Sequence, residues 1–115
     1  MKTLVIIPAY NESSNIVNVI NNLDNYYNNY DYIVINDCST DNTESILNVN
    51  NIRHITLPVN LGLAGAVQTG YKYAWENGYE CAIQFDGDGQ HEAIFISTMI
   101  KEIEKGADIV TMALS

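Results

Sequence analysis

Residues 81–91 read Cys-Ala-Ile-Gln-Phe-Asp-Gly-Asp-Gly-Gln-His, an apolar run that ends in two carboxylates separated by one glycine. The apolar run predicts a buried strand over residues 81–85. Asp86 and Asp88 follow it at positions i and i+2, which places both side chains on one face of the chain, and the glycines let the backbone turn tightly beneath them. Two such oxygen donors suit Mg²⁺ or Mn²⁺, and the competing interpretation is an ordinary acidic turn.

The rest of the chain alternates between apolar runs and segments with helical spacing. Further strands are predicted over residues 3–7, 32–35, 52–57 and 108–112, with Pro8 and Pro58 ending the first and third of them. Helices are predicted from the polar residues 11–14 to about residue 24, from 41 to 47, from about 60 to 77, and from 93 to 105. Asp41 and Glu44 have the spacing of a capping box, and Gly78 is suited to end the third helix.

This alternation predicts an α/β fold with a three-layer, doubly wound, mostly parallel sheet that is cut after its fifth strand. We expect a single domain over residues 1–115. Ligands bind to such sheets outside the carboxyl ends of the strands. Residues 10–12, 37–41 and 86–91 all follow predicted strand ends and carry acids, so we expect them to share one crevice.

Composition excludes several classes of protein. The net charge is −9 with only five Lys and Arg residues, which argues against a nucleic-acid partner. Cys38 and Cys81 each lie beside an apolar run, so we expect free thiols and a reducing compartment. The first apolar run is too short for a signal peptide and no run is long enough to span a membrane, which favours the cytoplasm.

Several catalytic patterns are missing from the chain. The glycine-rich segment after Asn60 lacks the Gly-Lys-Ser/Thr of a P-loop, and no dinucleotide fingerprint follows the first strand. A sugar-phosphate nucleotidyltransferase would need a basic, glycine-rich loop directly after that strand, where Pro8 stands. His54 is expected to be structural or exposed, and His91 is a residue of a first helical turn unless its place beside the acid pair gives it a role.

Four ordered motifs resemble those of family 2 glycosyltransferases. They are residues 8–12 (Pro-Ala-Tyr-Asn-Glu), residues 34–41 (Val-Ile-Asn-Asp-Cys-Ser-Thr-Asp), residues 60–62 (Asn-Leu-Gly) with Gly65, Ala66 and Gly70, and residues 86–91 (Asp-Gly-Asp-Gly-Gln-His). The last motif is most similar to the branch that contains dolichyl-phosphate mannose synthases and polyprenyl-phosphate glycosyltransferases. The resemblance implies the nucleotide-diphospho-sugar transferase fold, of which this chain carries the donor-binding part.

The resemblance also implies a metal-dependent, inverting transfer of a sugar from a nucleoside-diphosphate sugar to an acceptor, either a polyprenyl phosphate or a glycan. Pro8, Tyr10 and Glu12 would line the base and ribose site, and Asp37 would hydrogen-bond the base. Asp86 and Asp88 form a DXD motif, in which Asp86 would lie near the ribose and the metal, while Asp88 and Gln90 would ligate Mg²⁺ or Mn²⁺. The ion would neutralise the charge that develops on the leaving nucleoside diphosphate.

The chain departs from the pattern at two places. Glu92 and Ala93 follow the acid motif where the branch often has proline, and Leu63 stands where a basic residue is common. The family places acceptor-binding and catalytic residues beyond the fifth strand, so the catalytic residues are unknown here. The alternative interpretation is a non-catalytic nucleotide-sugar-binding or assembly module. We also expect a homodimer formed through an exposed sheet edge, and a location in the cytoplasm or at the cytoplasmic face of the membrane.

Overall fold

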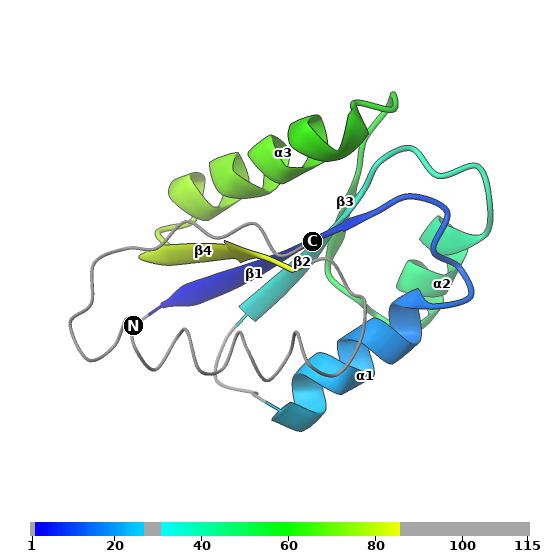
Figure 1. Ribbon diagram of the computed structural model, residues 1–115, viewed down its shortest axis with the longest axis horizontal. Coiled ribbons are helices and arrows are strands. Elements are labelled where there is room, and N and C mark those ends of the chain that lie inside the picture. Colours follow the sequence, from blue (N-terminus) through cyan, green and yellow to red (C-terminus); the bar gives the residue numbers. More distant parts are fainter. Residues whose placement is uncertain (1, 27–30, 86–115) are drawn as a thin grey trace.

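The structure is a computed structural model that describes residues 2–26 and 31–85. The described strands form one parallel sheet in the order β3-β2-β1-β4 (Figure 1). The strands are β1 (Thr3–Ala9), β2 (Asp31–Asn36), β3 (His54–Thr56) and β4 (Cys81–Gln84), and the helices are α1 (Ile16–Tyr26), α2 (Thr43–Val49) and α3 (Gly62–Glu76). The predicted α/β class and parallel pairing are therefore confirmed. The helix predicted over residues 93–105, the strand over 108–112 and the acid motif over 86–91 lie outside the described residues.

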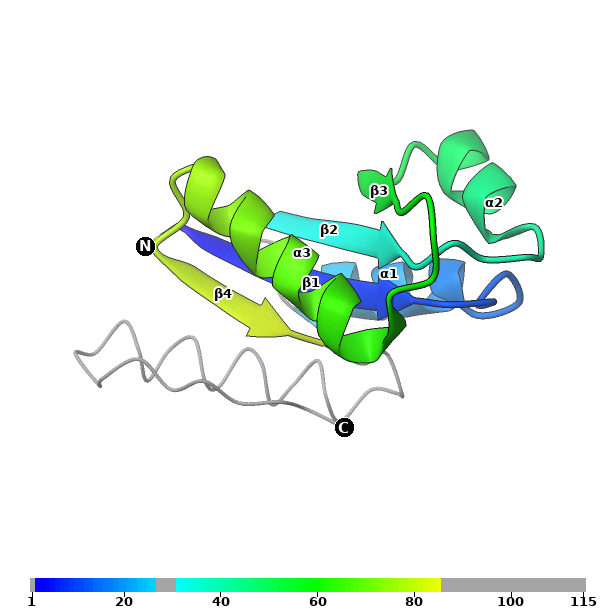
Figure 2. The same cartoon turned by 90° about the horizontal axis from the view of Figure 1, so that it is seen from above.

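Helices cover both faces of the sheet, as a doubly wound fold requires. Figures 1 and 2 show α3 crossing one face, with α1 on the other. The side chains of β1 alternate accordingly: Leu4 and Ile6 pack in the cluster that includes α3, whereas Val5 and Ile7 pack in the cluster that includes α1 and α2. All four are at most 1% exposed. The continuous apolar run of the first strand thus fills two cores at once, which is the pattern of a central parallel strand.

Pro8 does not end β1, contrary to the sequence prediction. The strand runs on through Ala9, and Pro8 stays in register with Ile35 of β2. Asp37 N–H donates to Ala9 O at 2.8 Å, so Ala9 turns its backbone groups toward β2 and the nitrogen of Pro8 faces the β4 side. The registered pairing with β4 ends at Ile6, two residues earlier. The missing N–H of Pro8 therefore costs no hydrogen bond to β2.

Two other predicted boundaries are wrong. β3 covers only His54–Thr56 instead of residues 52–57, because Ile52 N–H donates to Leu47 O at 2.9 Å and so still belongs to the turn after α2. The expected capping box does not form: the N-cap of α2 is Asn42, without a side-chain hydrogen bond, and α2 runs to Val49. Asp41 instead accepts a hydrogen bond from the backbone N–H of Thr43 at 2.9 Å.

Two glycines set the position of α3. Gly78 has φ +75° at the end of the helix, which confirms the predicted stop. Gly70 lies on Ile6 of β1 so closely that a Cβ on Gly70 would come within 2.4 Å of Ile6 Cγ2. The helix can approach the central strand only because this position has no side chain. In the described part of the chain, no helix has the length and apolarity that a membrane crossing needs.

Candidate functional site

A pocket of about 190 Å³ lies at the carboxyl ends of β1 and β2, beside the start of α3. Its lining residues are Pro8, Ala9, Tyr10, Glu12, Asp37, Leu63 and Ala66. The pocket therefore brings together the four described residues that the family resemblance assigned to the base and ribose. Their assembly follows from parallel pairing, since the carboxyl ends of neighbouring parallel strands meet at one edge. Asp86, Asp88 and Gln90 lie outside the described residues and stay predictions.

Asp37 joins the sheet, the pocket and α3. It is 4% exposed. Its Oδ1 accepts a hydrogen bond from the backbone N–H of Leu61 at 2.7 Å, and its backbone O accepts one from Asn60 Nδ2 at 3.3 Å. A carboxylate at the start of a helix is stabilised by the unpaired N–H groups there. Sequence reasoning missed this contact, because no local pattern links residues 24 positions apart.

The segment after β1 is tied to the segment after β2 by three consecutive backbone N–H groups. The three bonds run from Asn11 N to Ser39 Oγ (3.0 Å), from Glu12 N to Thr43 Oγ1 (3.0 Å) and from Ser13 N to Asp41 Oδ2 (3.2 Å). A fourth bond runs in the opposite direction: the backbone N–H of Thr40 donates to Oδ1 of Asn11 at 2.8 Å. We call this set of bonds between residues 11–13 and 39–43 the loop clasp. It fixes Tyr10 and Glu12 relative to Asp37.

Hydrogen bonds favour the charged form of the Asp41 carboxylate, which is also an acceptor of the loop clasp. A hydrogen bond from the Thr43 side chain is the main cause that lowers the pKa of Asp41 to about 2, and bonds from the Thr43 backbone and from Ser13 add to it. Desolvation acts in the opposite direction. Asp41 is therefore charged at neutral pH and accepts hydrogen bonds with both oxygens.

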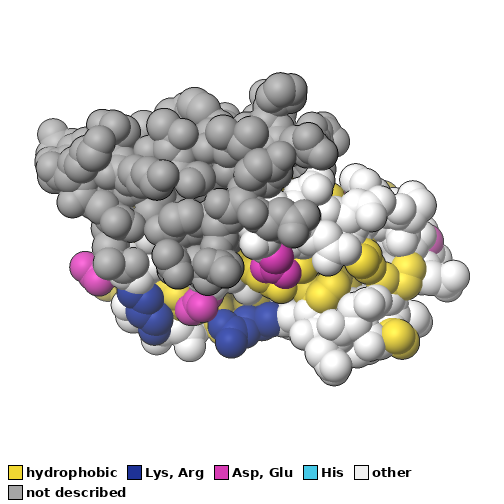
Figure 3. Space-filling view, turned by 90° about the horizontal axis from the view of Figure 1, so that it is seen from below, with side chains coloured by type: hydrophobic (Ala, Val, Ile, Leu, Met, Phe, Trp, Pro, Cys, Tyr) yellow, Lys and Arg dark blue, Asp and Glu magenta, His cyan; other side chains and the backbone are white. Residues whose placement is uncertain are grey.

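Basic side chains lie away from the pocket. Lys2, Arg53 and Lys72 are the Lys and Arg residues of the described part, and none of them lines the pocket. Lys72 pairs with Glu76 along α3 at 3.8 Å, and Lys2 Nζ lies 4.4 Å from the centre of the Tyr79 ring. Figure 3 shows one face on which Lys and Arg side chains lie close to Asp and Glu side chains. Glu12 and Asp37 thus give the pocket hydrogen-bond acceptors without a neighbouring cation among the described residues.

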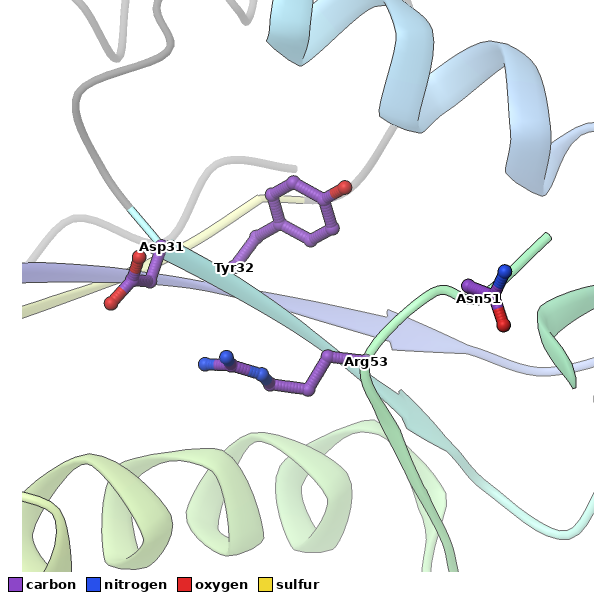
Figure 4. Close-up of a pocket in the computed structure, with 4 residues that line it drawn as sticks. All are labelled: Asp31, Tyr32, Asn51 and Arg53. Carbon is purple, nitrogen blue, oxygen red and sulfur yellow. The ribbon is translucent and has the colours of Figure 1, made fainter.

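A second, larger pocket of about 280 Å³ lies at the amino end of β2. It is lined by Asp31, Tyr32, Asn51 and Arg53 (Figure 4). Tyr32 packs toward the α1 cluster, and Figure 4 shows the Arg53 side chain on the other side of β2. None of the predicted site residues lines this pocket, and ligands of parallel sheets bind at the opposite edge. The smaller pocket is therefore the candidate functional site.

The predictions of a structural or exposed His54 and of two free thiols are confirmed, and the reducing compartment stays a prediction. His54 is half-buried with Nδ1 2.8 Å from Ile52 O, which is a structural contact. Cys38 and Cys81 are free thiols. Cys38 is half-buried directly after Asp37, with φ +58° and Sγ 3.7 Å from Pro58 O. Cys81 is buried in the sheet, and burial raises the pKa of its thiol.

A doubly wound parallel sheet with an acidic, partly aromatic pocket at its carboxyl edge is the arrangement of α/β proteins that bind ligands at that edge. Residues 4–114 match the model of glycosyl transferase family 2, and the chain belongs to this family. It is 41% identical to a UDP-N-acetylglucosamine–dolichyl-phosphate N-acetylglucosaminyltransferase of Methanococcus voltae, over 86% of this chain and 46% of the relative. The chain therefore spans less than half the length of this relative.

Solved structures have the same fold. TarS 1–349 of S. aureus in complex with UDP superposes with a TM-score of 0.68 and 26% identity, over 89% of this chain and 32% of that one. Glucosyl-3-phosphoglycerate synthase from Mycobacterium tuberculosis, in complex with Mn²⁺, UDP and glucosyl-3-phosphoglycerate, superposes with a TM-score of 0.69 and 21% identity, over 89% and 39%. The predicted fold class and family are thus confirmed.

Proposed function

We propose that this chain is the donor-binding part of a metal-dependent, inverting glycosyltransferase that uses a nucleoside-diphosphate sugar. The observation that carries the proposal is the pocket at the carboxyl edge, where Pro8, Tyr10, Glu12 and Asp37 meet. Tyr10 offers an aromatic face to a base, and the two carboxylates accept hydrogen bonds from base N–H or ribose hydroxyl groups. The family relationship and the UDP bound in TarS support the same choice of ligand.

Charge argues for a metal ion in the complete site. A nucleoside diphosphate is an anion, and the described lining of the pocket carries two carboxylates and no cation. No group of three or more His, Cys, Asp or Glu side chains within residues 2–26 and 31–85 could hold a metal. The donor set proposed from the sequence, Asp86, Asp88 and Gln90, consists of hard oxygen ligands that fit Mg²⁺ or Mn²⁺. When bound, the ion would stabilise the charge on the leaving nucleoside diphosphate.

A polyprenyl phosphate is the proposed acceptor class, with a glycan as the alternative. The support is the name of the Methanococcus voltae relative, which includes dolichyl phosphate. In an inverting transfer, the acceptor oxygen bonds to the anomeric carbon as the bond from that carbon to the diphosphate breaks. The proposed location is the cytoplasm, at the cytoplasmic face of the membrane if the acceptor is a lipid phosphate.

Calorimetric titration tests the proposal. We expect the 115-residue chain to bind UDP or GDP in the presence of Mn²⁺, and to lose that binding when EDTA is added. Asp88→Ala should weaken metal-dependent binding, whereas Asp24→Asn, which changes an exposed carboxylate of α1, should not. Absence of binding to both nucleotides would contradict the proposed function.

The alternative is a non-catalytic nucleotide-sugar-binding or assembly module. The pocket that Pro8, Tyr10, Glu12 and Asp37 line would serve such a module as well as an enzyme. Nucleotide binding without sugar transfer to a polyprenyl phosphate by the purified chain would favour this alternative, and detectable transfer would exclude it.

A further inference from the structure

We propose that Asn11 is a positioning residue for the nucleotide pocket, acting through the loop clasp; this inference rests on the proposed function. Asn11 lies between Tyr10 and Glu12, which both line the pocket, but it does not line the pocket itself. Its role follows from its backbone conformation and from its hydrogen bonds, in which its backbone N–H donates and its side-chain oxygen accepts.

The backbone of Asn11 adopts a conformation that few side chains accept. Its φ is +53°, in the left-handed region where asparagine and glycine are favoured. This conformation turns the chain directly after β1. The next two residues, Glu12 and Ser13, can then direct their backbone N–H groups toward Thr43 Oγ1 and Asp41 Oδ2. Each of these successive N–H groups therefore finds its own acceptor on the segment 39–43.

The side chain of Asn11 holds the opposite loop. Its Oδ1 accepts from the backbone N–H of Thr40 at 2.8 Å and from Thr40 Oγ1 at 3.3 Å. Its own backbone N–H donates to Ser39 Oγ, and Ser39 Oγ in turn donates to Oδ1 of Asn36. Asn36 is 1% exposed at the end of β2. The chain of bonds therefore connects the exposed Asn11 to a rigid, buried point of the sheet.

Both ends of the clasp carry pocket residues. Tyr10 and Glu12 flank Asn11, and Asp37 precedes the segment 39–43 that Asn11 holds. Tyr10 is 46% exposed, so the buried core does little to fix its position. Without the clasp, the pocket would have to order these loops when a ligand binds, and the fraction of binding-competent molecules would fall.

A matched control exists in the same chain. Asn51 also has φ +53°, is exposed, and lies in the turn after α2, where it lines the second pocket. Replacing either asparagine by glycine keeps the left-handed conformation and removes one side chain. The two variants therefore make the same kind of backbone change, but only Asn11→Gly removes a side chain of the loop clasp.

The experiment combines amide hydrogen exchange of the ligand-free chain with titration of UDP and of GDP in the presence of Mn²⁺. In Asn11→Gly, we expect the Thr40 and Glu12 amides to exchange about tenfold faster and Kd to rise about tenfold. Asn11→Asp keeps the Oδ1 acceptor and should restore the protection of Thr40. Asn51→Gly should change neither Kd nor the exchange of these two amides.

Two results with Asn11→Gly would overturn the inference: unchanged exchange, or faster exchange with an unchanged Kd. An equal rise of Kd in Asn51→Gly would also overturn it, because the effect would then be general. If the wild-type chain binds neither UDP nor GDP, the proposed function fails. In that case the exchange rates alone decide whether Asn11 holds the loop clasp, with faster exchange supporting it and unchanged exchange refuting it.

Discussion

At the scale of single residues, Asp37 is a buried and hydrogen-bonded member of the candidate site. The same carboxylate lines the pocket and accepts the Leu61 N–H at the start of α3. A ligand that uses Asp37 therefore has to share it with the helix. Because the side chain is 4% exposed, its position is set by the fold before any ligand arrives. A preordered acceptor of this kind lowers the cost of binding.

Substitutions at Asp37 should separate its two roles. Asp37→Asn keeps an oxygen for the Leu61 N–H, so we expect near-normal stability and nucleotide affinity reduced about tenfold. Asp37→Ala removes both interactions, and the free energy of unfolding should also fall by about 1–2 kcal/mol. Urea denaturation and calorimetry with UDP or GDP and Mn²⁺ measure the two quantities. Equal stability of Asp37→Ala and wild type would show that the bond to Leu61 contributes nothing.

Asp41 should give the protein a defined sensitivity to acid. Its folded-state pKa of about 2 lies below the ordinary value of 3.8, so the folded state favours the charged carboxylate. The resulting stabilisation is complete above that ordinary value and is lost as the pH falls through about 2. Asp41→Asn cannot titrate. The stability difference between wild type and Asp41→Asn should therefore be constant above pH 5 and shrink between about pH 4 and 2. Urea denaturation at each pH checks this, and a difference independent of pH would contradict it.

At the scale of elements, the sequence predicted which segments are strands and helices more reliably than where they end. β1 was recognisable as a continuous apolar run, and α3 was recognisable from its small residues and from Gly78 at its end. Pro8 misled the prediction because its effect depends on which neighbour its nitrogen faces, and only the sheet order determines that. Asp41 and Glu44 have the spacing of a capping box, but the oxygens of Asp41 accept hydrogen bonds from Ser13 and Thr43 instead. Ser13 belongs to another loop, so its contact with Asp41 is not visible in the local sequence.

The candidate site was predictable to a similar degree. Placement of Tyr10, Glu12 and Asp37 in one pocket followed from the rule that parallel strands share a carboxyl edge. The bond from Leu61 to Asp37 and the role of Asn11 were not predictable, because both depend on contacts between separate loops. The metal ligands Asp86, Asp88 and Gln90 remain predictions from the sequence.

The effect of Gly70→Ala on stability should depend on the size of residue 6, which faces Gly70 from β1. Gly70→Ala would place a Cβ 2.4 Å from Ile6 Cγ2, and Ile6 is fully buried on a central strand. We expect a loss of about 1–3 kcal/mol in the free energy of unfolding, despite the better helix propensity of alanine. In an Ile6→Ala background the space is free, so Gly70→Ala should be neutral or stabilising. Thermal or urea unfolding of the four variants tests this, and a loss of equal size in both backgrounds would contradict it.

At the scale of the whole molecule, the two edges of the sheet differ in chemistry. The carboxyl edge carries Glu12 and Asp37 in the candidate site. Lys2 and Arg53 lie at the amino edge, close to Tyr79, whose hydroxyl donates to Asp31 at 2.6 Å. Burial is the main cause that raises the pKa of Tyr79 to about 12, followed by this bond to Asp31. The tyrosine therefore stays neutral and ties the starts of β2 and β4 together at physiological pH.

Self-association is a prediction at this scale. β3 has three residues and lies at one edge of the sheet that residues 2–26 and 31–85 form. Its pairing with β2 begins only at Val34, so the first three residues of β2 have no registered partner on that side within this described part. Unpaired strand edges favour contact with a second chain. We expect light scattering to give the mass of a homodimer. A mass of one chain, about 12.8 kDa, at high protein concentration would contradict it.

The two cysteines differ in accessibility, so one of them can be labelled selectively near the candidate site. Cys81 is 6% exposed, with its thiol pKa raised by burial, so thiol reagents should reach it slowly. Cys38 is half-buried next to Asp37, and the chain contains no further cysteine. A maleimide fluorophore should therefore attach at Cys38, one residue after Asp37 of the pocket, without any engineered cysteine. The native protein would then carry a site-specific optical reporter, whose emission follows occupancy of the pocket in real time.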